Sequence, residues 1–164
     1  MVTIRPAALQ DLEEITNIYN EAILNTVATF DTEIKTIVEQ EKWFNAHGTK
    51  YPILVAVIDK VVGWASLSQW SDRCAYSDTA EISLYIKEQY RGQGVGKKLL
   101  AAIIQKGQEA GLHTVIARIA EGNEVSIHLH EVSGFDHIGV MREVGQKFGR
   151  RLDVYLMQKI YSSS

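Results

Sequence analysis

Cysteine is almost absent from this sequence of 164 residues, and proline is scarce. Because Cys74 is the only cysteine, no disulfide can form within the chain, which fits a protein of the reducing cytoplasm. The two prolines are accompanied by no low-complexity tract, so we predict one domain over residues 1–164. No apolar run is long enough to span a bilayer, and the first residues lack the pattern of a signal peptide. These absences predict a cytoplasmic location and no membrane partner.

Charge and histidine spacing exclude two further classes of function. The formal net charge of -3 argues against a general nucleic-acid binder, which is usually basic. His128 and His130 are two residues apart, which places them on different faces of a helix. No histidine has metal-site spacing with another ligand. We therefore expect neither a nucleic-acid partner nor a bound metal.

The most informative stretch runs from Glu81 to Leu100 and combines a strand, a glycine-rich loop and a helix. Residues from Glu81 to Lys87 alternate with the two-residue period of a strand. The loop from Arg91 to Gly96 follows, and a helical pattern begins at Lys97. This order aims unpaired backbone N–H groups at the helix N-terminus, where the helix dipole also favours an anion. Since glycine has no Cβ to keep a phosphate away from the backbone, the stretch predicts a pyrophosphate site.

Three kinds of phosphate-binding loop compete for this stretch. The kinase-type P-loop, G-x-x-x-x-G-K-[ST], does not fit, because Lys98 stands where a hydroxyl must hold magnesium. The dinucleotide pattern G-x-G-x-x-G does not fit either, because these glycines read G-x-G-x-G and follow several predicted strands. The pattern [RQ]-x-x-G-x-[GA] fits Arg91 to Gly96 in full. This segment resembles the coenzyme A pyrophosphate motif of the GNAT superfamily of N-acetyltransferases, although a glycine-rich turn that merely ends a strand remains an alternative.

Periodicity along the rest of the chain predicts an α/β (α+β) fold. Pro6 is expected to stop the first strand, Thr36 and Glu39 form a capping-box signature, and residues 147–151 form a basic loop. The predicted strands are 2–5, 51–58, 61–68, 81–87, 113–120, 135–144 and 152–160. The predicted helices are 9–26, 37–47, 97–107 and about 124–133. This order gives a mixed central sheet of about seven strands flanked by about four helices, which is also the element order of the GNAT fold.

A second motif extends the resemblance. The segment from Asn123 to Phe135 resembles the family pattern N-x-x-[AS]-x-x-L-Y-x-x-x-G-F, with His130 in place of the tyrosine. Over nearly its whole length, the chain resembles the phosphinothricin and methionine sulfoximine N-acetyltransferases. The matching stretches are Thr29-Phe30, Trp70-x-x-Arg73-x-x-Tyr76, Thr79-x-Glu81, Leu129-His130-Glu131 and residues 144–153. The last stretch is nearer the methionine sulfoximine branch, because the phosphinothricin branch carries glycine, tryptophan and histidine near Arg150 to Leu152.

The resemblance supports Glu81 as the general base. At neutral pH an α-amino group is largely protonated, so its acetylation requires a base. Glu81 begins the strand that leads to the glycine loop, and it would act directly or through a water. The alternative is a surface glutamate at the edge of a strand.

The resemblance also implies acetyl-CoA as co-substrate. In the family, backbone groups of the strand at Leu84, Tyr85 and Ile86 pair with the pantetheine arm. A backbone N–H there polarises the thioester carbonyl, as in an oxyanion hole. Asn123 bonds the pantetheine arm, caps its helix, or does both. The residues expected at the pyrophosphate are Arg91, Gly92, Gln93, Gly94, Val95 and Gly96.

His130 stands where the superfamily usually places a tyrosine near the sulfur, and the phosphinothricin-like branch has histidine here. A histidine can protonate a thiolate near neutral pH, which makes His130 a candidate general acid. The alternative is a helix histidine that packs against the co-substrate without a proton role.

We expect the acceptor to bind mainly between residues that loops contribute. An arginine can donate two parallel hydrogen bonds to the carboxylate of an amino acid, and Arg73 is the candidate for this role. The alternative is that Arg73 is a solvated charge in a loop. Aromatic side chains can form the wall beside the acceptor side chain. The expected acceptor contacts are Phe30, Arg73, Cys74, Tyr76 and Ser83. The resemblance further implies a homodimer, in which Lys147, Phe148 and Arg150 close the site, either of the same chain or of the partner subunit.

The leading interpretation is an N-acetyltransferase that acetylates the α-amine of a small amino-acid-like acceptor of the methionine sulfoximine, methionine sulfone or phosphinothricin type. Direct transfer in a ternary complex is favoured, because Cys74 lacks a histidine or acid at a recognisable spacing. One alternative acts on a protein N-terminus or lysine and needs an open groove, whereas Phe30, Trp70 and the basic loop indicate a closed pocket. The other is a non-catalytic CoA-binding module, which needs neither acid nor base.

Overall fold

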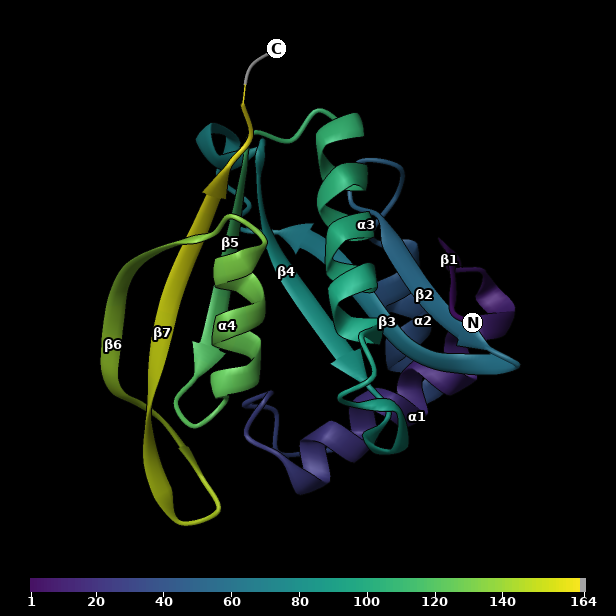
Figure 1. Ribbon diagram of the computed structural model, residues 1–164, viewed down its shortest axis with the longest axis horizontal. Coiled ribbons are helices and arrows are strands. Elements are labelled where there is room, and N and C mark those ends of the chain that lie inside the picture. The colour runs from purple at the N-terminus through teal and green to yellow at the C-terminus, as the bar shows by residue number, and fades with distance from the viewer. Residues whose placement is uncertain (163–164) are drawn as a thin grey trace.

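A computed structural model describes residues 1–162 of the chain, so Ser163 and Ser164 of the predicted domain lie outside the described residues. The strands form one seven-stranded sheet in the order β1-β2-β3-β4-β5-β7-β6 (Figure 1). The strands are β1 (Thr3–Pro6), β2 (Ile53–Ile58), β3 (Lys60–Gln69), β4 (Thr79–Ile86), β5 (Thr114–Ala120), β6 (Asp136–Lys147) and β7 (Arg150–Ile160). The α-helices are α1 (Leu12–Asn25), α2 (Ile37–Asn45), α3 (Val95–Glu109) and α4 (Glu124–Val132). The predicted mixed sheet and the order of its elements are confirmed.

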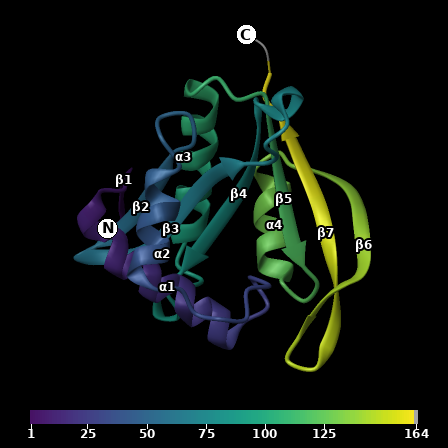
Figure 2. The same ribbon diagram turned by 180° about the vertical axis from the view of Figure 1, so that it is seen from behind.

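The helices cover the two faces of the sheet unequally. Helices α3 and α4 lie on one face (Figure 1), and α1 and α2 lie on the other, over its β2-β3 half (Figure 2). The amphipathic α3 buries Leu99 and Ile103 in the larger core. The amphipathic α1 buries Ile15 and Ile18 in a second core with Trp64 of β3. None of the helices in residues 1–162 is long and apolar enough to cross a membrane.

The sheet opens between β4 and β5. These strands run parallel, and they pair only where Thr79–Glu81 meets Thr114–Ile116. Beyond Glu81 the two strands diverge, as Figure 1 shows, while β4 continues to pair with β3 as far as Ile86. The edge of β4 from Ile82 to Ile86 that faces β5 therefore has no strand partner. Backbone N–H and C=O groups on that edge are left to bind water or a ligand.

The β6–β7 hairpin differs from the predicted basic loop. Strand β6 extends to Lys147 and β7 begins at Arg150, so the expected loop over residues 147–151 is wrong. Only Phe148 and Gly149 form the turn, and both have positive φ, at 53° and 73°. The hairpin is therefore longer than the periodicity indicated, because the polar residues Gln146, Lys147, Arg150 and Arg151 at its tip continue the ladder without an apolar alternation.

Two local signals near the N-terminus had different outcomes. The capping box of α2 is confirmed, since Thr36 Oγ1 accepts from Glu39 N–H at 3.2 Å and Glu39 Oε1 accepts from Thr36 N–H at 3.3 Å. Strand β1 ends at Pro6, one residue later than expected, because Pro6 itself belongs to the strand, opposite Leu54 of β2. Strand β1 is at the edge of the sheet, where a residue without an N–H is tolerated.

Candidate active site

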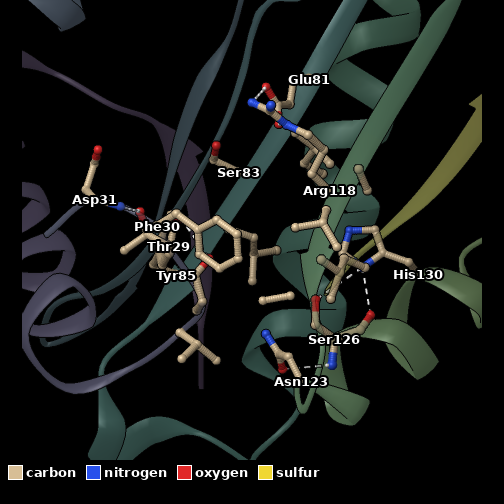
Figure 3. Close-up of a pocket in the computed structure, with 18 of the residues that line it drawn as sticks. Thr29, Phe30, Asp31, Glu81, Ser83, Tyr85, Arg118, Asn123, Ser126 and His130 are labelled. Atoms are coloured by element: carbon tan, nitrogen blue, oxygen red, sulfur yellow. Dashed lines mark hydrogen bonds and ion pairs between the residues drawn. The ribbon is translucent and has the colours of Figure 1, made fainter. Parts of the chain in front are cut away.

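A cavity of about 440 Å³ opens where β4 and β5 diverge. This volume suits a small ligand. Its walls include Glu81–Tyr85 of β4, Ala117–Ala120 of β5, residues 27–31 of the α1–α2 loop, and Asn123, Ser126 and His130 at α4. Figure 3 shows the α1–α2 loop, the strands β4 and β5, and α4 contributing side chains from different sides of the cavity.

Glu81 and Arg118 form an ion pair at one side of the cavity (Figure 3). Arg118 donates from Nε to Glu81 Oε2 at 2.5 Å and from Nη2 to Glu81 Oε1 at 2.8 Å. The hydrogen bond to Glu81 raises the pKa of Arg118 above its ordinary value. The Arg118 guanidinium also lies over the ring of Trp70, with Cζ 5.6 Å from the ring centroid. Since the Glu81 side chain is 22% exposed and the Arg118 side chain 50%, a ligand in the cavity can reach both.

His130 lies in the cavity wall as a neutral imidazole. Its Nδ1 is 2.7 Å from the Ser126 carbonyl oxygen, and because a carbonyl only accepts, Nδ1 carries the proton. Burial lowers the pKa of His130, whose residue is 4% exposed. The Phe135 ring packs edge-on against the imidazole, at 4.9 Å between centroids. The Nε2 atom of the neutral ring therefore bears a lone pair, and it must gain a proton before it can donate one.

The α1–α2 loop is held over the cavity by two elements. The Tyr19 hydroxyl of α1 hydrogen-bonds Thr29 Oγ1 at 3.0 Å and also donates to Asp31. From β6, Lys147 donates its Nζ to the backbone carbonyls of Thr26 and Thr29, both at 2.7 Å. Lys147 is 4% exposed, and burial lowers its pKa. A buried ammonium bonded to two carbonyls ties the hairpin to the loop.

Phe30 is positioned by the same hairpin. Its ring lies against Gly145 of β6 so closely that a Cβ at position 145 would overlap the ring. Phe30 lines the cavity, as does Ser83 of β4. The structure therefore brings two of the predicted acceptor residues, Phe30 and Ser83, to the same cavity as Glu81.

Three other predicted acceptor residues do not line the cavity. Arg73 precedes the short 3-10 helix η2 (Cys74–Tyr76), and Arg73, Cys74 and Tyr76 are exposed. Trp70, at the start of the loop that carries them, contacts the site, because its ring lies against Arg118. Contact of Arg73, Cys74 and Tyr76 with an acceptor stays a prediction.

The glycine loop, Arg91–Gly96, connects the end of β4 to the start of α3. Gly92 and Gly94 have φ of 75° and 83°, a backbone conformation that side chains with a Cβ rarely adopt. The first backbone bond at the start of α3 runs from Lys98 N–H to Gly94 O at 3.3 Å. Within residues 1–162, the amides from Gly92 to Lys97 donate to no backbone carbonyl. These N–H groups at a helix N-terminus can bind an anion, although none of them lines the cavity itself.

The other residues predicted to contact the co-substrate lie along the path from the cavity to the glycine loop. Leu84 and Tyr85 line the cavity, whereas Ile86 is buried at the end of β4. Arg91 Nε donates to the Ile86 carbonyl at 3.0 Å and so fixes the loop to the strand. Asn123 lines the cavity, and its Oδ1 accepts from Ser126 N–H at 3.4 Å, which confirms its predicted role as the cap of α4.

This arrangement defines what the site can do chemically. A carboxylate lies at one end of an unpaired strand edge, and an anion-binding loop lies at the other. A long anionic ligand can pair with the strand edge between them, and an amine can bind beside the carboxylate. In the part of the chain that the structure describes, no three His, Cys, Asp or Glu side chains group as metal ligands would.

The fold is that of an acetyltransferase. A family model described as "Acetyltransferase (GNAT) domain" matches residues 4–156, and the chain belongs to this family. The chain is similar to the L-methionine sulfoximine/L-methionine sulfone acetyltransferase of Pseudomonas paraeruginosa. The two are 41% identical over 159 residues, which cover 95% of this chain and 92% of that protein.

Two solved structures are also similar. One is a GNAT superfamily phosphinothricin acetyltransferase from Sinorhizobium meliloti in complex with AcCoA, with a TM-score of 0.94 and 36% identity, covering 97% of this chain and 88% of that one. The other is a ribosomal-protein-alanine N-acetyltransferase from Brucella melitensis, with a TM-score of 0.93 and 37% identity, covering 97% of this chain and 99% of that one. The relatives thus include acetyltransferases named for small acceptors and one named for a protein acceptor.

Proposed function

We propose that this protein transfers acetyl from acetyl-CoA to the α-amine of a small amino-acid-like acceptor, of the methionine sulfoximine, methionine sulfone or phosphinothricin type. One observation carries the proposal: the cavity follows the unpaired edge of β4 from Glu81 toward the glycine loop. A site of this form can hold a pyrophosphate, an extended arm and an amine in one line.

The chain's own groups fit coenzyme A. The amides from Gly92 to Lys97 would bind the pyrophosphate, and Gln93, Val95 and Gly96 would contribute through their backbone N–H groups. Arg91 would hold the loop to β4. The unpaired edge at Leu84, Tyr85 and Ile86 would pair with the pantetheine arm as a further strand does. A backbone N–H on this edge would polarise the thioester carbonyl, which favours attack by the amine.

Glu81 is proposed as the general base. It accepts a proton from the ammonium of the acceptor, directly or through a water. The amine nitrogen then forms a bond to the acetyl carbon and gives up a second proton, the carbon–sulfur bond breaks, and the sulfur leaves as a thiolate. The thiolate takes up one of the two protons, and the other passes to solvent. Arg118 holds both Glu81 oxygens and so directs the carboxylate into the cavity.

His130 is proposed to take part as a neutral imidazole. Nδ1 is bound to the Ser126 carbonyl, and burial lowers the pKa of His130, so a proton on Nε2 is disfavoured near neutral pH. Of the two predicted roles, this burial favours packing beside the co-substrate over proton donation to the thiolate. The thiolate then takes its proton from the acceptor's ammonium by way of Glu81 or solvent.

The second candidate function is acetylation of a protein N-terminus. The similarity to the ribosomal-protein-alanine N-acetyltransferase of Brucella melitensis favours it. Against it, the α1–α2 loop is fixed over the cavity by Tyr19 and Lys147, and a peptide would require an open groove there.

We further propose that residues 1–164 act as one cytoplasmic domain in a homodimer. The exposed apolar residues Ile138, Val140 and Val144 of the edge strand β6 support an interface there. Sedimentation equilibrium at micromolar concentration is expected to give twice the 18.4 kDa of one chain. A mass of one chain under these conditions would contradict the dimer.

The experiment that tests the function is an acceptor screen. Release of coenzyme A thiol is measured with methionine sulfoximine, methionine sulfone, phosphinothricin, the common amino acids and short peptides. Release with amino-acid acceptors and none with peptides is the expected result. Release with peptides alone would favour the protein acceptor, and no release with any acceptor would favour a binding module.

A further inference from the structure

The cavity offers a carboxylate one cationic partner. Among the described residues that line it, Arg118 is the one arginine or lysine. Lys147 is turned away, since its Nζ donates to the carbonyls of Thr26 and Thr29. Arg73, the predicted partner of the acceptor carboxylate, does not line the cavity. A negatively charged group bound here would therefore approach Arg118.

The Arg118 guanidinium has donors left for such a group. Nε and Nη2 donate to Glu81, whereas Nη1 donates to no group within residues 1–162. The ring of Trp70 lies against the guanidinium and limits its rotation. The side chain is half exposed, so the remaining N–H groups can be reached from the cavity. A guanidinium whose position is already fixed loses little freedom when it binds a second carboxylate.

We propose that Arg118 is a specificity-determining residue, which binds the α-carboxylate of the acceptor while Glu81 faces its α-amine. This proposal deepens the proposed function and rests on it. An α-amino acid carries its opposite charges on one carbon atom, and Glu81 and Arg118 present opposite charges in direct contact. The ammonium of the acceptor therefore meets Glu81, and its carboxylate meets Arg118.

Glu81 and Arg118 together disfavour the binding of acceptors without a carboxylate. A plain amine brings only a positive charge, which Arg118 repels while Glu81 attracts it. The N-terminal residue of a peptide keeps its amine but has an amide in place of the carboxylate, so it leaves the Arg118 donors unpaired. Arg118 thus selects free amino acids over amines, esters and protein N-termini.

The test compares two acceptors that differ in one charge, L-methionine sulfone and its methyl ester. Steady-state thiol release is measured for the wild type and for Arg118→Met. We expect the substitution to lower kcat/KM for the free acid roughly 10- to 100-fold, mainly through KM, because a charge-assisted hydrogen bond is lost. For the ester we expect a smaller loss, which comes only from the release of Glu81 by Arg118. The ratio of kcat/KM for the acid to kcat/KM for the ester is therefore expected to fall about 10-fold or more.

Two further variants keep the test decisive. Arg118→Lys retains the positive charge and is expected to retain part of the preference for the acid. Arg5→Met removes the partner of Asp11, a second bidentate pair with bonds of 2.7 and 2.9 Å outside the cavity, and is expected to leave the acid-to-ester ratio unchanged.

The outcomes separate this proposal from the proposed function. Equal losses on acid and ester in Arg118→Met would mean that Arg118 only orients Glu81, and would overturn the proposal. A wild type that acetylates the ester as well as the acid would also overturn it, while leaving N-acetyl transfer intact. A wild type that acetylates no amino acid would overturn the proposed function, and the assignment of Arg118 with it.

Discussion

At the scale of residues, Glu81 is held in place without being enclosed. Arg118 occupies one direction at each carboxylate oxygen, which leaves further lone pairs for an ammonium or a water. The side chain is 22% exposed, so an acceptor can reach it. A carboxylate held this way can remove a proton from an amine without first reorienting.

Replacing this carboxylate tests its role as base. We expect Glu81→Gln to lower kcat roughly 10²- to 10⁴-fold, the usual effect of losing a general base. Turnover is measured by thiol release with methionine sulfone. Glu109→Gln, which changes an exposed carboxylate at the end of α3 paired with Lys106, is the control and should retain full activity. Nearly unchanged turnover in Glu81→Gln would remove Glu81 from the mechanism.

His130 gives a prediction about pH. Because the neutral ring donates Nδ1–H to Ser126 and has a lowered pKa, we expect His130→Phe to keep the shape of the wild-type pH–rate profile. The rate itself is expected to fall by less than about tenfold, through altered packing against Phe135. A general acid would behave differently, since its loss would abolish the decline in rate at high pH. That result would restore the acid role to His130.

At the scale of elements, the shape of the acceptor side depends on contact between the β6–β7 hairpin and the α1–α2 loop. Lys147 binds two carbonyls of the loop, and Gly145 makes room for the Phe30 ring. The hairpin and the loop are far apart in sequence, since Lys147 and Thr29 are separated by 118 positions. Their contact therefore forms only when the whole sheet has formed.

Adding one methyl group at this contact should disturb it. We expect Gly145→Ala to displace Phe30, to lower the free energy of unfolding by about 1–3 kcal/mol, and to raise KM for the acceptor more than KM for acetyl-CoA. Denaturant unfolding and steady-state kinetics measure the two effects. Gly139→Ala is the matched control in β6, because a Cβ there meets nothing within 4 Å. Equal behaviour of the two variants would show that Phe30 moves freely.

At the scale of the whole molecule, stability should depend on buried neutral histidine. His47 is 8% exposed, and burial lowers its pKa below the ordinary value of 6.5. Its ring lies 2.7 Å from the Trp43 carbonyl through Nδ1 and 3.0 Å from Ser68 Oγ through Nε2. Below about pH 6.5 the unfolded chain takes up a proton that the folded chain resists. The stability from His47 is therefore complete above that pH and is lost as the pH falls toward the folded-state pKa.

This dependence can be measured by thermal unfolding. We expect Tm to fall from about pH 7 to about pH 5, and to fall less steeply in His47→Gln, which has no proton to gain. His128→Gln, at an exposed position of α4, is the control and should follow the wild type. The same slope in His47→Gln and the wild type would contradict the prediction.

Much of the fold was determined by the sequence through local chemistry. Alternation, helical periodicity and caps depend on residues a few positions apart, so the order of the elements, the capping box at Thr36 and the cap at Asn123 could be predicted. The glycine loop could be predicted for the same reason, since Gly92 and Gly94 adopt a backbone conformation that glycine favours. The tip of the β6–β7 hairpin could not, because its polar residues lack a strand period.

The tertiary structure alone decided which side chains meet in the cavity. Arg118 was missed, although it is the one exposed residue in the buried strand TVIARIA, because its partner Glu81 lies 37 residues away on β4. The unpaired edge of β4 was likewise decided by where β5 turns away from it. Sequence periodicity records which face of an element is buried, but it does not record which element lies opposite. The acceptor end of the site is made by such long-range neighbours, whereas the anion-binding end is made by one continuous stretch of chain.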